Sequence, residues 1–187
     1  MYHPSRKHLW LLVQFVAFQA AWFACVLGAA RGTPWIGMAA VALVWGVQTA
    51  FSPARCQDII LALTAAALGL LWDTAMLRTG VVVYASPGPV SDWAPGWILA
   101  LWILLSTILR EPLRWLHGRS LLSALVGGVG GALSYWSAVR LGAGTFDNLS
   151  RALPVLGAGW AIITPALTEF ARWLAARQIR CGRTARS

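Results

Sequence analysis

The chain carries long runs of apolar residues that recur along nearly its whole length. A helix rises about 1.5 Å per residue, so about 17–25 residues are needed to cross a hydrocarbon layer about 30 Å thick. Six runs of about this length, bounded by charged residues or by proline and glycine, cover residues 9–30, 35–51, 58–77, 93–109, 121–139 and 152–175. The pattern predicts a protein that crosses a membrane six times.

A soluble domain of this size could not bury so much apolar side chain. The 187 residues are 58% hydrophobic and only 11% charged, so the surplus apolar surface must face lipid. The runs are continuous and rich in Leu and Ala, which favours helices over barrel strands with their alternating pattern. We therefore expect an all-α fold, a six-helix transmembrane bundle, in which residues 1–187 form one integral membrane domain.

Basic residues indicate the orientation of the bundle. Of the 15 lysines and arginines, all but Arg31, Arg78, Arg140 and Arg151 fall on the side that holds both termini when segments are assigned alternately. Cytoplasmic segments carry the excess of positive charge, so both termini are expected in the cytoplasm. The formal charge of +9 then belongs to this rim and to the tail 177–187, where it favours anionic lipid head groups and not nucleic acid.

Histidine and cysteine positions give no support for a metal site. His3, His8 and His117 lie outside the six runs, and no Cys-x-x-Cys pair occurs. No imidazole is therefore expected inside the bilayer to ligate haem or a catalytic metal, and the sequence predicts no metal and no cofactor.

Asp73 is an acid in the interior of an otherwise apolar run, where an ionised group is expensive. The stripe that it shares at helical spacing is made mostly of small residues, Gly69 among them. Small residues mark the approach of another helix, so Asp73 is expected to point into the bundle, with Gly69 as a packing position. A buried carboxylate also needs a partner.

Arg140 is the partner that the sequence favours for Asp73. It ends the fifth run at the same side of the membrane, and its long side chain can reach back toward the depth of the acid. Arg78 and Arg31 are weaker candidates. Two interpretations stay open: a structural ion pair that fixes helix register, or a polar centre that holds a ligand head group or shuttles a proton.

The fifth run has an unusual glycine pattern. Gly127 and Gly131 form a G-x-x-x-G motif, and Gly128 and Gly130 widen the groove beside it. The motif predicts close packing by another helix, with a groove that admits a lipid chain as the alternative. The candidate ligand-binding residues are polar or aromatic side chains within the runs or at their ends, namely Gln19, Trp22, Asp73, Trp102, Tyr135 and Arg140.

Four segments resemble, in order, the blocks of a known family. They are FQAAWFACVLGAARG, LGLLWDTAMLRTGV, WILALWILLSTILREPLRWL and GGVGGALSYWSAVRLGA. The family is a bacterial inner-membrane family described as a domain of unknown function, and the resemblance covers nearly the whole chain. It implies a compact protein with several spans in the inner membrane, encoded near genes that resemble cyclopropane-fatty-acid synthases. Arg110-Glu111 departs from the Asn-His that family members favour after the fourth span.

Three functional classes follow from these features. The favoured one is a non-catalytic partner in fatty-acyl or lipid modification, which binds membrane lipid or docks a cytoplasmic lipid-modifying enzyme. The second is a membrane-embedded lipid-modifying enzyme that uses Asp73, with Tyr135 or Glu169 as a further acid or base. The third is a small transporter, although the two halves show no internal repeat. The oligomeric state is left open by the sequence.

The predicted orientation can be tested with reporter fusions to the full chain. A fluorescent protein fused to the C-terminus should be bright, and alkaline phosphatase at the same position should be inactive, because the C-terminus is expected in the cytoplasm. Active phosphatase at that position would mean that the bundle is inverted.

Overall fold

The computed structural model describes residues 4–177, and the basic tail predicted beyond residue 177 lies outside them. Six helices form the described part, and five of them are long and apolar enough to cross a membrane. The predicted all-α, multi-pass fold is therefore confirmed. The helices are α1 (Pro4–Ala30), α2 (Pro34–Phe51), α3 (Arg55–Arg78), α4 (Gly96–Leu109), α5 (Ser120–Arg140) and α6 (Leu149–Ala176).

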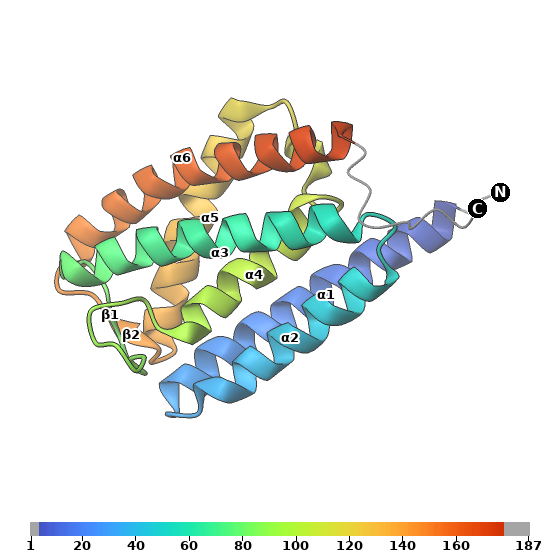
Figure 1. Ribbon diagram of the computed structural model, residues 1–187. Helices are drawn as coiled ribbons and strands as arrows, with labels where there is room; N and C mark the ends of the chain where they lie inside the picture. Colours follow the sequence, from blue (N-terminus) through green and yellow to red (C-terminus); the bar gives the residue numbers. More distant parts are fainter. Residues whose placement is uncertain (1–3, 178–187) are drawn as a thin grey trace.

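The helices run alternately up and down, so the bundle has two distinct ends (Figure 1). One end, called here the terminus end, holds the start of α1 and the end of α6. The other, called the strand end, holds the short strands β1 (Val83–Tyr84) and β2 (Gly144–Thr145). Helices α1 and α2 pack as one hairpin, and α5 and α6 pack as another.

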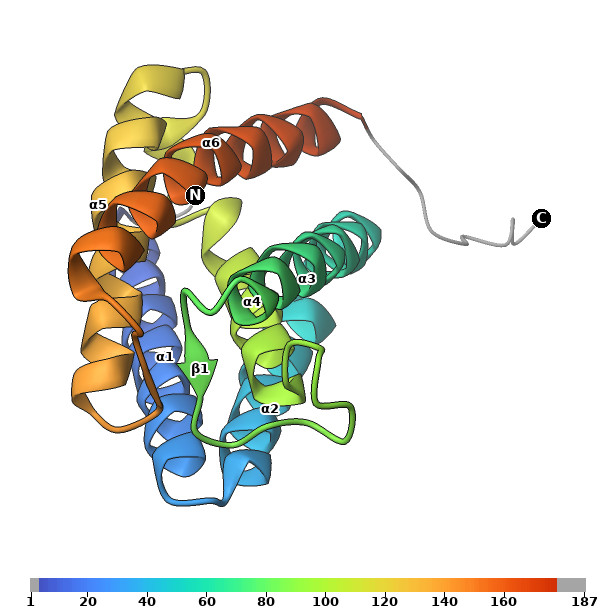
Figure 2. The same cartoon turned by 90° about the vertical axis from the view of Figure 1, so that its left-hand side faces the viewer.

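Helix α4 lies in the interior of the bundle. It packs against α1, α2 and α3, and Figure 2 shows it between α3 and α1. Nine of its 14 residues are buried, including Trp97 and Trp102. Because it is enclosed by other helices, its backbone polar groups and apolar side chains are shielded from lipid and from water alike.

The fourth predicted span is longer than the helix that forms there. Helix α4 has 14 residues, which corresponds to about 21 Å and is too short for a hydrocarbon layer about 30 Å thick. The preceding segment contains Pro87, Pro89 and Pro95, and Pro95 is the N-cap residue of α4. Proline lacks a backbone donor and disfavours helix at the residue before it, so the helix starts only after the last proline.

The strand end is closed by a small antiparallel sheet that the sequence analysis did not predict. Val83 pairs with Thr145 and Tyr84 pairs with Gly144. The Ser86 hydroxyl donates to the Ala29 carbonyl oxygen at 2.7 Å, which ties the same loop to the end of α1. The loop that follows α3 is therefore held against both α1 and the segment after α5.

The three glycines predicted as packing positions lie against bulky groups. A Cβ atom on Gly69 would overlap the Trp102 indole, and one on Gly131 would overlap the Trp160 indole. A Cβ atom on Gly127 would overlap the Thr164 side chain. The G-x-x-x-G motif of α5 thus faces α6 of the same chain, and Gly69 of α3 faces α4.

Replacing Gly69 should destabilise the bundle, whereas a matched change in open space should not. Gly69→Leu would overlap the Trp102 ring, and such overpacking typically costs about 1–3 kcal/mol. Gly46 in α2 has no atom within 4 Å of the place where a Cβ would lie, so Gly46→Leu is the control. Thermal unfolding in detergent should show a lower midpoint for Gly69→Leu alone, and equal midpoints would contradict the packing described here.

Candidate functional site

Asp73 is completely buried in the bundle, with 0% of its surface exposed. It lies in the last third of α3, one helical turn beyond Gly69, on the face that meets α4. The inward orientation predicted from the small-residue stripe is therefore confirmed. A carboxyl group at such a site must have its oxygens satisfied by the protein, because water does not reach them.

Three aromatic side chains donate hydrogen bonds to the Asp73 carboxyl group. The Tyr84 and Tyr135 hydroxyls both donate to Oδ1, each at 2.5 Å. The Trp102 indole Nε1 donates to Oδ2 at 2.6 Å. Bonds of this length to an acid are the strong kind, and each removes a carboxyl lone pair from an apolar environment. The three donors come from β1, α4 and α5, so one side chain of α3 joins three other parts of the fold.

The predicted ion pair between Asp73 and Arg140 is wrong. Arg140 is exposed, and its guanidinium lies over the Trp136 ring at 5.9 Å from the ring centroid. Among the described side chains, those of residues 8–177, the ion pairs are Arg110 with Asp58 and Arg172 with Glu169, and neither involves Asp73. Neutral donors replace the expected cation because phenol and indole groups bring a hydrogen bond without the desolvation penalty of a second charge.

Tyr84 was not singled out in the sequence, although it is one of the three donors. It follows the turn at Gly80, where φ is +71°, a conformation that glycine adopts readily. Burial, followed by the nearby Asp73 carboxylate, raises the pKa of the Tyr84 phenol well above its ordinary value. The hydroxyl therefore stays protonated and remains a donor at neutral pH.

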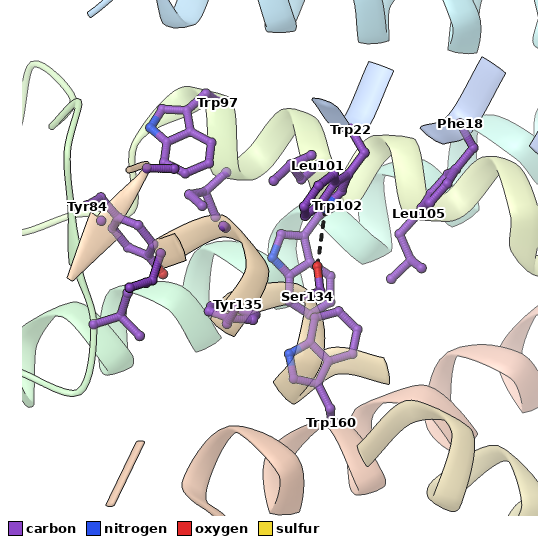
Figure 3. A pocket seen from close by; sticks show the side chains of 16 residues that line it. Phe18, Trp22, Tyr84, Trp97, Leu101, Trp102, Leu105, Ser134, Tyr135 and Trp160 are labelled. Carbon is purple, nitrogen blue, oxygen red and sulfur yellow. Dashed lines mark hydrogen bonds between the residues drawn. The ribbon is translucent and has the colours of Figure 1, made fainter. Parts of the chain in front are cut away.

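The three donors also form part of the wall of an apolar cavity of about 100 Å³ (Figure 3). Asp73 itself does not line this space. It lies behind the wall and holds three of the wall's polar atoms away from the interior of the cavity. The residues labelled in Figure 3 are Phe18, Trp22, Tyr84, Trp97, Leu101, Trp102, Leu105, Ser134, Tyr135 and Trp160.

Aromatic contacts make the wall continuous. The Trp102 and Trp160 rings stack with centroids 4.9 Å apart and an interplanar angle of 13°. Tyr84 meets Trp97 edge to face at 5.7 Å, and the Trp97 Nε1 donates to the Ser86 carbonyl oxygen at 3.1 Å. Such contacts add about 0.5–1.5 kcal/mol beyond the area they bury and fix the ring orientations. The cavity is thus built by rings whose polar atoms mostly have partners.

A larger groove of about 710 Å³ opens beside the cavity, between α1 and α5. Its lining combines apolar side chains with five glycine or serine positions of α5, among them Gly130 and Ser137. The cavity and the groove share five lining residues, namely Phe18, Trp22, Leu105, Ser134 and Trp160. At this junction the Trp22 Nε1 donates to the Ser134 hydroxyl at 3.2 Å and bridges the two helices.

The predicted ligand-binding candidates fall into three places. Trp102 and Tyr135 line the cavity, Gln19 and Arg140 line the groove, and Trp22 lines both. Asp73 lines neither. The sequence therefore found residues that the fold brings to one region. It did not predict Trp97 or Trp160, whose positions depend on contacts with Tyr84 and with Trp102 in other elements.

Two polar groups in the same region have no hydrogen-bond partner within the described part of the chain. They are the Trp160 Nε1 and the Thr164 Oγ1, both buried, and both residues line the groove. A buried unsatisfied donor typically costs about 1–3 kcal/mol.

The terminus end carries two ion pairs. Arg110 contacts Asp58 at 2.7 Å, and Arg172 contacts Glu169 at 2.7 Å in i, i+3 geometry. Glu169 also accepts from the Gly118 backbone N–H at 2.8 Å. Within residues 4–177, no group of three or more His, Cys, Asp or Glu is placed to hold a metal ion.

Comparison with family models matches residues 11–166 to the family described as "Protein of unknown function (DUF2878)". No curated protein and no solved structure matches the chain. The match covers all three elements that contribute donors to Asp73, as well as both helices that border the groove. It agrees with the predicted resemblance to a family of unknown function.

The geometry predicts a specific loss when Asp73 becomes asparagine. In Asp73→Asn the amide oxygen can accept from both tyrosines, but the amide NH₂ then faces the Trp102 N–H, and that bond is lost. The expected loss of stability is about 1–3 kcal/mol, measured as the unfolding midpoint in detergent. Asp73→Leu, which leaves all three donors without an acceptor, should lose more.

A double-mutant cycle isolates the indole bond. In a Trp102→Phe background no indole N–H remains, so the additional loss from Asp73→Asn should be much smaller. If Asp73→Asn lowers the midpoint equally in both backgrounds, the hydrogen bond from Trp102 does not hold the site together.

Proposed function

Because the chain belongs to the DUF2878 family, whose function is unknown, its role has to be inferred from the site, and we propose that it binds the hydrocarbon chain of a membrane lipid. In this proposal the protein is a non-catalytic component of fatty-acyl or lipid metabolism. The inner membrane, with both termini in the cytoplasm, is the location proposed for it.

The observation that carries the proposal is that all three donors to Asp73 line one apolar cavity. The short hydrogen bonds to Asp73 hold the two phenol hydroxyls and the indole N–H toward the acid, which lies outside the cavity lining. The ring faces and edges are left toward the cavity. An apolar ligand gains from such a surface, whereas a polar ligand would find few groups with which to pair.

The size of the cavity favours the end of a chain over a whole molecule. A comparable apolar cavity of about 150 Å³ in another protein binds benzene, and the space here is about 100 Å³. It accommodates a few methylene groups. The rest of a longer chain would occupy the groove of about 710 Å³ that shares five wall residues with the cavity.

The same geometry argues against Asp73 as an acid or base that touches a substrate. A general acid or base must approach the reacting group within about 2.6–3.2 Å, directly or through one water. Asp73 is 0% exposed and lines neither the cavity nor the groove. In this proposal it is a positioning residue that orients the aromatic wall.

Entry to the cavity would pass the bond between Trp22 and Ser134. These two residues border both spaces, and the bond between them, at 3.2 Å, is at the upper end of the usual range. A chain that moves from the groove into the cavity would displace the indole from the hydroxyl and take its place between α1 and α5.

Photo-crosslinking of the full-length protein tests the proposal. A phospholipid with a diazirine at the end of one acyl chain, reconstituted with the protein in nanodiscs, should label the cavity residues of α4 and α5. Ala138 lines only the cavity, so Ala138→Leu should fill the space and reduce labelling there about tenfold, which corresponds to about 1.4 kcal/mol.

The matched control is Ala67→Leu, which adds the same side chain at an exposed position of α3. It should leave labelling of the cavity unchanged. Labelling confined to the outer faces of the helices, and equal in both variants, would contradict the proposal.

A further inference from the structure

The geometry points to a ligand class for the groove: we infer that it binds a phospholipid with an anionic head group, which pairs with Arg140 at the strand end. The inference rests on the proposed function, because it assumes that the chain of the same lipid lies in the groove. It adds the chemistry of the head group and the end of the bundle at which that head group lies.

Arg140 is the charged residue in the lining of the groove. It ends α5, its side chain is exposed, and no carboxylate pairs with it among the described residues. Its guanidinium lies over Trp136, another lining residue, at 5.9 Å from the ring centroid. The N–H groups are free of any carboxylate among the described residues, and a guanidinium donates two parallel hydrogen bonds to a phosphate.

The lining also discriminates between head groups. No acidic residue borders the groove, and its polar side chains other than Arg140 are uncharged, for example Gln19 and Ser137. An anionic phosphate finds a cation there, but the ammonium of a zwitterionic head group finds no carboxylate. Charge complementarity therefore favours a lipid whose head group has a net negative charge.

The depth of the groove agrees with one leaflet of a membrane. Ten residues of α5 separate Gly130 from Arg140, which corresponds to about 15 Å, half of a hydrocarbon layer about 30 Å thick. A lipid whose head group lies at Arg140 therefore places its chain along α5 down to Gly130. Ser134, where the groove meets the cavity, lies on this path.

Gly130 leaves the space that the chain needs. No atom lies within 4 Å of the position that its Cβ would take, although the residue lines the groove. The groove is open toward the membrane, since the bordering side chains of Leu133 and Trp136 are exposed. A phospholipid can thus enter sideways from the bilayer with its second chain left in lipid.

The test compares two photo-lipids with identical diazirine chains, one with a phosphatidylglycerol head group and one with a phosphatidylcholine head group. With the full-length protein in nanodiscs, the phosphatidylglycerol probe should label the groove residues of α5 more strongly. Arg140→Gln should remove this preference, which is expected to be about tenfold for one charge-assisted contact.

Arg78→Gln is the matched control. Arg78 also lies in the last turn of a helix at the strand end, is exposed, and has a guanidinium 5.9 Å from the centroid of a tryptophan ring, that of Trp93. It does not line the groove. The preference should survive Arg78→Gln. Equal losses in both variants would attribute the preference to the general charge of the rim and overturn the inference.

A second pair of variants tests the path of the chain. Gly130→Leu should reduce labelling of the groove about tenfold, because the new side chain fills the space, whereas Gly46→Leu on α2 should not. Both glycines have open space at the Cβ position, so neither change should disturb packing.

The outcomes separate this inference from the proposed function. If the groove and cavity are labelled equally by both photo-lipids, an acyl chain is bound but the assignment of an anionic head group is wrong. A photo-reactive fatty acid serves as a third probe. If it alone labels the groove and cavity, the ligand is a free carboxylate and the phospholipid assignment is wrong. If no probe labels them, the proposed function fails as well.

Discussion

Asp73 joins four separate parts of the chain through a single carboxyl group. Its own helix, α3, is linked to β1 through Tyr84, to α4 through Trp102 and to α5 through Tyr135. Each donor is an amphipathic ring that can satisfy the acid and still present an apolar surface on its other side. The acid therefore costs desolvation free energy, but it sets the orientation of three rings at once, and those rings form the wall of the cavity.

The short central helix is what makes this arrangement possible. Because α4 is packed against α1, α2 and α3, the chain before it can form an irregular loop with three prolines, and other parts of the protein cover that loop. The loop brings Tyr84 and Ser86 over the end of the bundle, where they meet α3 and α1. The enclosed position of α4 then places both Trp97 and Trp102 in the lining of the same cavity.

The sequence was sufficient for the fold and for part of the site. Apolar runs predict the six helices because a membrane requires continuous apolar length, a constraint that is local along the chain. The small residues around Asp73 predict its inward orientation, because the stripe that they form is also a local pattern along one helix. The identity of its partners is not local, and the rule that a buried charge needs a counter-charge selected Arg140, although neutral donors can do the same. Tyr84 depends on a turn and a two-residue sheet, for which the sequence gives almost no signal.

The hydrogen bond between Trp22 and Ser134 joins two helical hairpins, each of which packs mainly within itself. Helix α1 belongs to the hairpin with α2, and α5 belongs to the hairpin with α6. Among the described residues, this bond of 3.2 Å is the side-chain hydrogen bond between α1 and α5. A small separation of the two hairpins would therefore break the contact between α1 and α5 at this bond, while every helix keeps its own backbone hydrogen bonds. Both residues line the groove, so under the proposed function a lipid chain would exchange at this contact without passing through water.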